Sequence, residues 1–236
     1  MGQAGMASAQ PVRPQGPLWH PRRLAQLYFQ PAQFFAPERQ LDEWPTVLYV
    51  MWAVGVVASL DRMEAQVVRG ELAPGTPGFP PSLANSWLLA WILLLVVGGL
   101  SGLLLWIVGG WWYRVRLRWA GTQAVDSHEA RLTYAFVKLV AALPTLFVLA
   151  LATVRYPNFL AAAQTTSVLD ILPPVFIVWG LVVSYFAVRA RFQIGTGGAF
   201  VWFLLLPVVF YIVGFVLLGM LMAGLGATTP TAAAAA

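Results

Sequence analysis

The chain contains no cysteine, and only 10% of its 236 residues are charged. Without cysteine there can be no disulfide, no thiolate catalysis and no Cys-ligated metal. An average soluble domain is about 25% charged, so these few charged side chains cannot form the polar surface of a water-soluble fold. Because 59% of the residues are hydrophobic, the composition excludes an ordinary soluble enzyme, a disordered chain and a nucleic-acid-binding domain.

Motifs of catalytic, nucleotide-binding or metal-binding chemistry are also missing. The sequence has no P-loop, no GxSxG and no GxGxxG. Its two histidines, His20 and His128, stand outside the apolar runs and lack the spacing of a zinc site. We therefore predict no catalytic residues, no cofactor site, no metal site and no enzymatic activity.

Five apolar runs dominate the sequence. A helix that crosses a hydrocarbon core of about 30 Å needs roughly 20 apolar residues. The first run, 44–60, is short and would cover only about 26 Å. The predicted fold class is therefore all-α, a polytopic bundle of five transmembrane helices at 44–60, 82–113, 132–154, 171–188 and 199–225. We expect the segments 1–16 and 226–236, which lack apolar runs of this length, to be disordered tails.

Basic residues lie mainly on one side of these spans. If the N-terminal segment, the second loop and the fourth loop share a side, that side carries ten Lys and Arg and the other carries three. Positively charged loops remain in the cytoplasm, so we predict a cytoplasmic N-terminus and an outward-facing C-terminus. Arginine greatly outnumbers lysine and alanine is abundant, which is typical of GC-rich bacterial genomes and suggests the bacterial inner membrane.

Residues 17–43 have the pattern of a helix that lies on the cytoplasmic leaflet. Two arginines precede an aromatic face, and Pro31 is placed to begin a second short helix. Aromatic side chains beside arginines favour membrane-surface contact. The alternative is that the segment packs on the protein itself. The residues predicted to contact the membrane surface are Arg22, Arg23, Phe29, Phe34 and Phe35.

Lys138 is the one charged residue well inside a predicted span. An ionisable residue inside a membrane is a candidate for substrate or ion binding. A lysine about 10 Å from the helix end can also extend its ammonium group to the lipid headgroups, which is a purely structural role. Asp61 and Asp170 stand at the outer boundaries of two runs, where we expect them to be helix-end residues.

Small residues recur at spacings that allow helices to approach closely. Gly98 and Gly102 have GxxxG spacing, and Gly219 and Ala223 repeat the spacing in the last span. We interpret both pairs as packing within one subunit rather than as a dimer contact. Prolines at 144, 173–174 and 207 lie in or at the start of the last three spans and can free carbonyl groups toward a cavity.

Three short segments carry a family resemblance. They are FQPAQFF at 29–35, EARLTYAFVKLVAALP at 129–144, and RFQIGTGGA at 191–199. In this order they resemble the Yip domain (Ypt-interacting type) proteins, which are small five-span membrane proteins with a cytoplasmic N-terminus. The resemblance is to the bacterial members and extends over about 17–225. Eukaryotic members act in vesicle traffic with Rab-type GTPases, and that role does not transfer directly to a bacterial protein.

Two functions remain open at this point. The resemblance implies a non-enzymatic membrane scaffold or a partner subunit of a membrane complex, which needs no charge network inside the membrane. The alternative is a small permease or lipid transporter, with Lys138 in a cavity between proline-broken helices. The expected partners are membrane lipids and other membrane proteins, with no nucleic acid, and the oligomeric state is left open.

Overall fold

The computed structural model describes residues 20–39, 41, 44–72, 81–122 and 125–226. All regular elements in these ranges are helices, and five helical stretches are long and apolar enough to cross a membrane. These findings confirm the predicted all-α class with five spans. The five stretches are Trp44–Val67, Trp87–Trp119, Ser127–Arg155, Val168–Phe192 and Thr196–Gly214. The predicted tails, 1–16 and 226–236, lie outside the described residues except for Gly226.

The helices have the following bounds. Two short helices precede the spans, α1 (Pro21–Phe29) and α2 (Pro31–Phe34). The first three spans are α3 (Trp44–Leu72), the series α5 (Trp87–Leu104), η1 (Leu105–Gly109) and α6 (Gly110–Trp119), and α7 (Ser127–Arg155). The last two are η2 (Val168–Ile171) with α9 (Leu172–Phe192), and the series α10 (Thr196–Phe200), η3 (Val201–Leu205) and α11 (Leu206–Gly226). Two connecting helices are α4 (Pro81–Ala84) and α8 (Phe159–Gln164).

Helix α3 is longer than the apolar run from which it was predicted. The run ends at Leu60, but the helix continues to Leu72 through residues that are mostly good helix formers. Asp61 therefore lies inside a helix and not at its end, which corrects the expectation from sequence. A charge-free run marks only the part of a helix that suits lipid, whereas backbone hydrogen bonds continue into the charged part.

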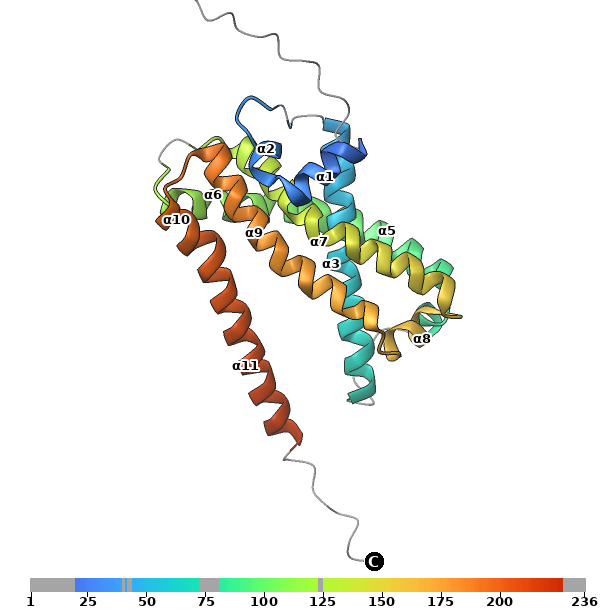
Figure 1. Ribbon diagram of the computed structural model, residues 1–236. Coiled ribbons are helices and arrows are strands. Elements are labelled where there is room, and N and C mark those ends of the chain that lie inside the picture. The colour runs from blue at the N-terminus through green and yellow to red at the C-terminus, as the bar shows by residue number, and fades with distance from the viewer. Residues whose placement is uncertain (1–19, 40, 42–43, 73–80, 123–124, 227–236) are drawn as a thin grey trace, which may run out of the picture.

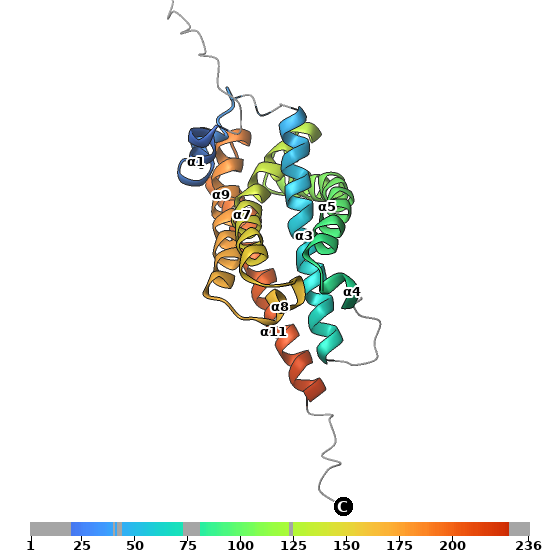
Figure 2. The same ribbon diagram turned by 90° about the vertical axis from the view of Figure 1, so that its right-hand side faces the viewer.

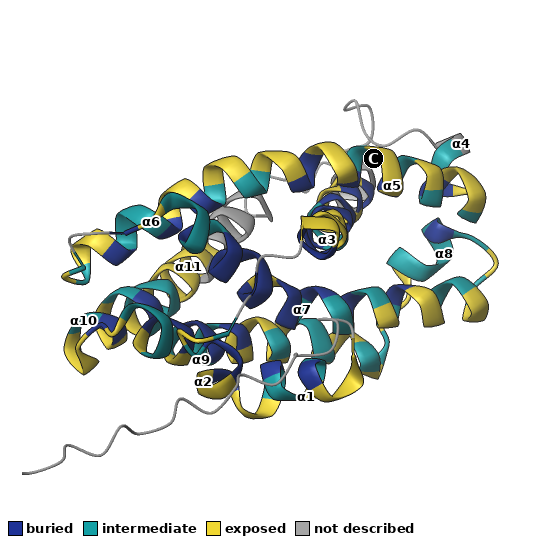
Figure 3. Ribbon diagram, turned by 90° about the horizontal axis from the view of Figure 1, so that it is seen from above, coloured by how far each residue is buried: buried dark blue, intermediate teal, exposed yellow. Residues whose placement is uncertain are grey.

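Four of the spans form the body of the bundle, and the fifth stands apart. Helix α3 packs against α5 and α7, and α7 packs against α9. In Figure 1, α11 diverges from the other helices along most of its length, and Figure 2 shows α3 between α5 and α7. Seen from above in Figure 3, the buried residues gather where α3, α7 and α9 face one another. Leu139, Val140 and Val183 are among the fully buried side chains there.

Glycines bring the backbones of α3 and α5 into direct contact. A Cβ atom added to Gly98 would lie 2.6 Å from Val56 Cγ2, and one added to Gly55 would lie 2.7 Å from the Cα of Gly102. Two hydrogen bonds cross the same interface, from Ser59 to Ser101 and from the Trp52 indole to the Leu95 carbonyl. Small residues and interhelical hydrogen bonds are the means by which helices associate in lipid.

The last-span pair of small residues behaves differently from Gly98 and Gly102. No described residue lies within 4 Å of a Cβ atom added to Gly219 or to Gly214. The side chain of Ala223 is outside the described residues. The packing within one subunit that we expected at Gly219 is therefore not found, because α11 diverges from the bundle before it reaches this residue.

The N-terminal helices pack on the protein itself. Leu27, Phe34 and Phe35 are almost fully buried, and the Phe34 ring contacts the Phe136 ring of α7 at 5.6 Å between centroids. The Tyr28 hydroxyl donates to the Val140 carbonyl at 3.0 Å. Burial raises the pKa of the Tyr28 phenol above its ordinary value, so the hydroxyl keeps the proton that it donates.

These contacts change the expected membrane-surface residues. Arg23, Phe34 and Phe35 are buried against the protein and do not present their side chains to the leaflet, because α7 and α9 form an apolar surface on which α1 and α2 pack. Arg22 is exposed and Phe29 is 82% exposed. For these two residues, membrane contact stays a prediction.

Arg191 fixes the segment that follows α2. Its guanidinium donates to three backbone carbonyls, those of Ala36, Pro37 and Arg39, at 2.9 to 3.2 Å. The same group forms an ion pair with Glu129 at 2.8 Å. The end of α9, the start of α7 and the N-terminal segment are thereby held at one point.

The root of the fifth span is held in a similar way. In the π-helix η3, the Trp202 carbonyl accepts two hydrogen bonds from Arg116 of α6, one of them at 2.9 Å. The Arg116 guanidinium also lies 4.4 Å from the centre of the Phe203 ring. Beyond this point α11 continues directly from η3, and Phe210, Ile212 and Leu217 are each more than half exposed.

We expect Gly98→Ala to weaken the bundle and Gly99→Ala to leave it intact. The added methyl group at position 98 would overlap Val56, and overpacking of this kind costs about 1–3 kcal/mol. At position 99 the nearest atom is 3.7 Å away, on the Trp52 side chain, which is ordinary contact. Thermal unfolding in detergent measures the difference. Equal unfolding temperatures for the two variants would contradict the close α3–α5 contact.

We also expect Phe34→Ala with Phe35→Ala to release the N-terminal helices, because truncating a buried phenylalanine costs about 3–5 kcal/mol. Phe29→Ala is the matched control, since Phe29 is exposed. Trypsin cleavage after Arg39 measures release, and we expect it to accelerate roughly tenfold or more in the double variant alone. Equal cleavage of all three proteins would show that the segment is not docked.

Candidate functional site

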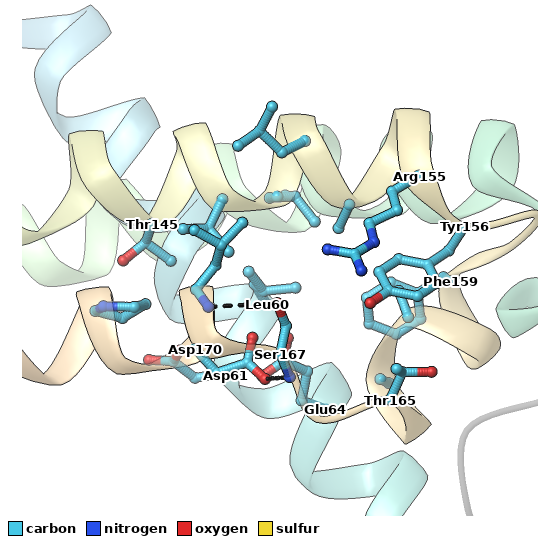
Figure 4. Close-up of a pocket in the computed structure, with 18 of the residues that line it drawn as sticks. Leu60, Asp61, Glu64, Thr145, Arg155, Tyr156, Phe159, Thr165, Ser167 and Asp170 are labelled. Carbon is cyan, nitrogen blue, oxygen red and sulfur yellow. Dashed lines mark hydrogen bonds between the residues drawn. The ribbon is translucent and has the colours of Figure 1, made fainter.

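A pocket of about 450 Å³ lies at the end of the bundle away from α1 and α2. It is lined by the later turns of α3, the last turns of α7, helix α8, and the segment from η2 into α9. Figure 4 shows Arg155 reaching into this space from α7, with Asp61, Glu64 and Asp170 grouped on the other side. Charges of both signs therefore line one cavity.

The local sequence explains how each carboxylate is placed. Asp61 and Glu64 are three residues apart on α3, a spacing that puts both on one helix face. Asp170 belongs to a capping box: its carboxylate accepts from the Ser167 backbone N–H at 2.6 Å, while the Ser167 side chain caps η2. The helix-end role predicted for Asp170 agrees with this geometry. The charges of Asp61 and Asp170 both act on Glu64.

Arg155 supplies the positive charge of the pocket. It is the last residue of α7, where a cation interacts favourably with the helix dipole. Its guanidinium lies 5.6 Å from the centre of the Tyr156 ring. Among the described residues it forms no ion pair within 4 Å and no hydrogen bond, although three carboxylates line the same pocket.

Aromatic residues form one wall of the pocket. The Trp87 indole donates to the Tyr156 carbonyl at 2.9 Å, and its ring packs edge-on against Phe159. One turn further along α5, Trp91 donates to Thr153 at 3.1 Å. Tryptophan and tyrosine gather at the level of the lipid headgroups. This pattern predicts a position for the pocket near the boundary between the hydrocarbon core and the headgroup region of a membrane.

Lys138 lies outside the pocket lining. Its side chain is exposed on α7, and its ammonium group is 5.9 Å from the centre of the Tyr134 ring. Its charge acts on Asp61 of α3. The structural role and the functional role of Lys138 both stay predictions.

Two pocket residues were not singled out by the sequence. Glu64 and Arg155 stand at the ends of apolar runs, where charged residues are common. The pairing of Glu64 with Asp61 at a three-residue spacing was a usable signal, but only once α3 is known to continue past Leu60. Nothing in the sequence relates Arg155 to these carboxylates, because folding brings together helices that are far apart in the chain.

The described side chains offer no group of three or more His, Cys, Asp or Glu that could hold a metal ion. His20 accepts a hydrogen bond from the Arg22 backbone at the start of α1, and His128 packs against the Trp106 ring. Within the described residues, His20 thus caps a helix and His128 contributes to ring packing.

No family model matches the chain, and no match is found among curated proteins or among solved structures.

Proposed function

We propose that the protein is a non-enzymatic scaffold or partner subunit of a membrane complex, and that it presents its fifth span to another membrane protein. The observation that carries this proposal is the isolation of α11. In the apolar windows of the first four spans, 28% to 50% of the residues are buried inside the protein, against 11% in the fifth. All residues at 209–214 of α11 are exposed, so this stretch of the helix is available to a partner on every face.

Two further features support a protein partner for this helix. Gly214 and Gly219 leave open space beside the backbone, which permits the close approach that helix pairs in lipid require. The root of the span is fixed by Arg116, so the direction in which α11 leaves the bundle is defined. A fixed direction lowers the cost of ordering the helix when it binds.

The proposal includes the setting that the sequence indicates. A Yip domain type of protein in a bacterial inner membrane, with the N-terminus in the cytoplasm, agrees with five spans and with the basic N-terminal side. In this orientation Arg191 and Arg116 lie near the cytoplasmic face and the charged pocket faces outward.

A small permease or lipid transporter is the second candidate, and the charged pocket favours it. Pro173 and Pro174 begin α9 at the pocket wall, so the cavity does lie beside a helix that starts with proline. A transporter would also use Lys138, whose charge acts on Asp61.

Lys138→Met separates the two candidates. We expect the variant to accumulate normally and to keep its partner contact, because the exposed lysine makes no hydrogen bond or ion pair with any described residue. Protein level and complementation of a deletion strain are the measurements, with Arg62→Met as the control. Loss of complementation at a normal protein level, in the Lys138 variant alone, would favour transport over the scaffold.

Photo-crosslinking tests the scaffold proposal. A benzophenone amino acid at Phe210 of α11 should give one protein adduct of defined mass in native membranes, and one at Leu100 of α5 should not. The two sites are matched, because their side chains are 65% and 63% exposed. Gly214→Leu with Gly219→Leu should abolish the adduct, since bulky residues block close helix approach. Lipid adducts alone at both sites would contradict the proposal.

A further inference from the structure

We propose that the charged pocket binds the headgroup of a zwitterionic phospholipid with a primary ammonium group, of the ethanolamine type. The ammonium group would lie against Asp61 and Glu64, and the phosphate against Arg155. This inference concerns a lipid held at the end of the bundle, and it does not depend on the partner proposed for α11.

The charged side chains of Arg155, Asp61 and Glu64 are unpaired within the described residues. Arg155 and the carboxylates of Asp61 and Glu64 face one cavity, yet none of them forms an ion pair within 4 Å or a hydrogen bond with a described residue. Opposite charges that share a cavity without touching leave room for a molecule that carries both. A guanidinium is suited to a phosphate, which it can bind through two parallel hydrogen bonds.

The pocket lies at the level that we expect for lipid headgroups. The uncharged run of α3 ends at Leu60, and Asp61 and Glu64 occupy the next turn. On the opposite wall, the Trp87 and Tyr156 rings mark the level at which aromatic residues meet lipid headgroups. A phosphate and an ammonium group are thus present at this level in any membrane that contains such a lipid.

The size of the cavity also suits a lipid headgroup. A volume of about 450 Å³ lies within the range of small-molecule sites and suits a headgroup with its glycerol, but not two acyl chains. Leu151 of α7 and Ile177 of α9 line the pocket and are each 38% exposed. The acyl chains can leave the cavity along these two apolar side chains and remain in the bilayer.

The charge balance predicts which lipids are rejected. Three carboxyl groups and one guanidinium line the pocket, and the carboxyl groups outnumber the cations even when Lys138, whose charge acts on Asp61, is included. The site therefore disfavours an anionic headgroup such as phosphatidylglycerol. The trimethylammonium group of phosphatidylcholine has no N–H to donate to a carboxylate. The ethanolamine ammonium offers three such donors, as a lysine does.

Native mass spectrometry of the full chain tests the inference. With equal amounts of phosphatidylethanolamine and phosphatidylglycerol in detergent, we expect the first bound lipid to be the ethanolamine type by about fivefold or more, because of the like-charge repulsion. Asp61→Asn with Glu64→Gln should bring the ratio near one, and Arg155→Gln should reduce binding of both lipids. Arg62→Gln, on α3 but outside the lining, is the matched control.

The outcomes decide the proposal in each direction. Equal binding of the two lipids by the wild-type protein, or an unchanged ratio in the carboxylate variant, would overturn it. Arg155→Lys keeps the charge at this position and should retain part of the binding, which guards against a variant that merely misfolds. If soluble glycerophosphoethanolamine displaces the lipid at equal concentration, the site takes the soluble ester and the lipid proposal fails.

Discussion

Backbone contact between α3 and α5 at Gly55, Gly98 and Gly102 is the constraint on which the rest of the structure depends. Apolar helices gain little from hiding their surfaces when the surrounding lipid is equally apolar, so close approach and interhelical hydrogen bonds must hold them together. This contact sets the line of α3, and α3 carries Asp61 and Glu64 to the pocket. It also sets α5, which brings Trp87 to the opposite wall.

Arginines fix the other end of the bundle through backbone carbonyls rather than through ion pairs alone. Arg191 binds three carbonyls of the N-terminal segment, and Arg116 binds the Trp202 carbonyl of a π-helix. Charge-assisted hydrogen bonds of this kind are stronger than those between neutral groups. The basic residues that suggest the orientation of the protein in a membrane therefore also hold the N-terminal helices and the root of the fifth span.

The sequence predicted the all-helical class and the five spans, because a helix that suits lipid requires a long charge-free run. Pro31 correctly predicted the start of a second short helix. The burial of Phe34 and Phe35 could not be predicted, since an amphipathic segment has the same pattern whether lipid or protein covers it. The open space beside Gly219 could not be predicted either, because GxxxG spacing does not show whether the helix that packs against it belongs to the same chain.

The pocket was only partly foreseeable. Asp61 stood out as a charge at the boundary of a span, whereas Arg155 acquires its meaning only from the helices that fold around it. The pocket combines residues from α3, α7 and η2, which are separated by long stretches of chain. No local sequence pattern predicts that these residues lie together. Their proximity results from the packing of α7 against α3 and α9.

If the first four spans form a packed body and the fifth serves a partner, electron cryo-microscopy of the protein, extracted from its native membrane with the surrounding lipid, will show both directly. We expect a transmembrane helix of another protein against α11 at the level of Phe210 to Leu217, with the other four spans arranged as described. A map in which only lipid surrounds α11, or in which α11 packs against α3, would contradict this expectation.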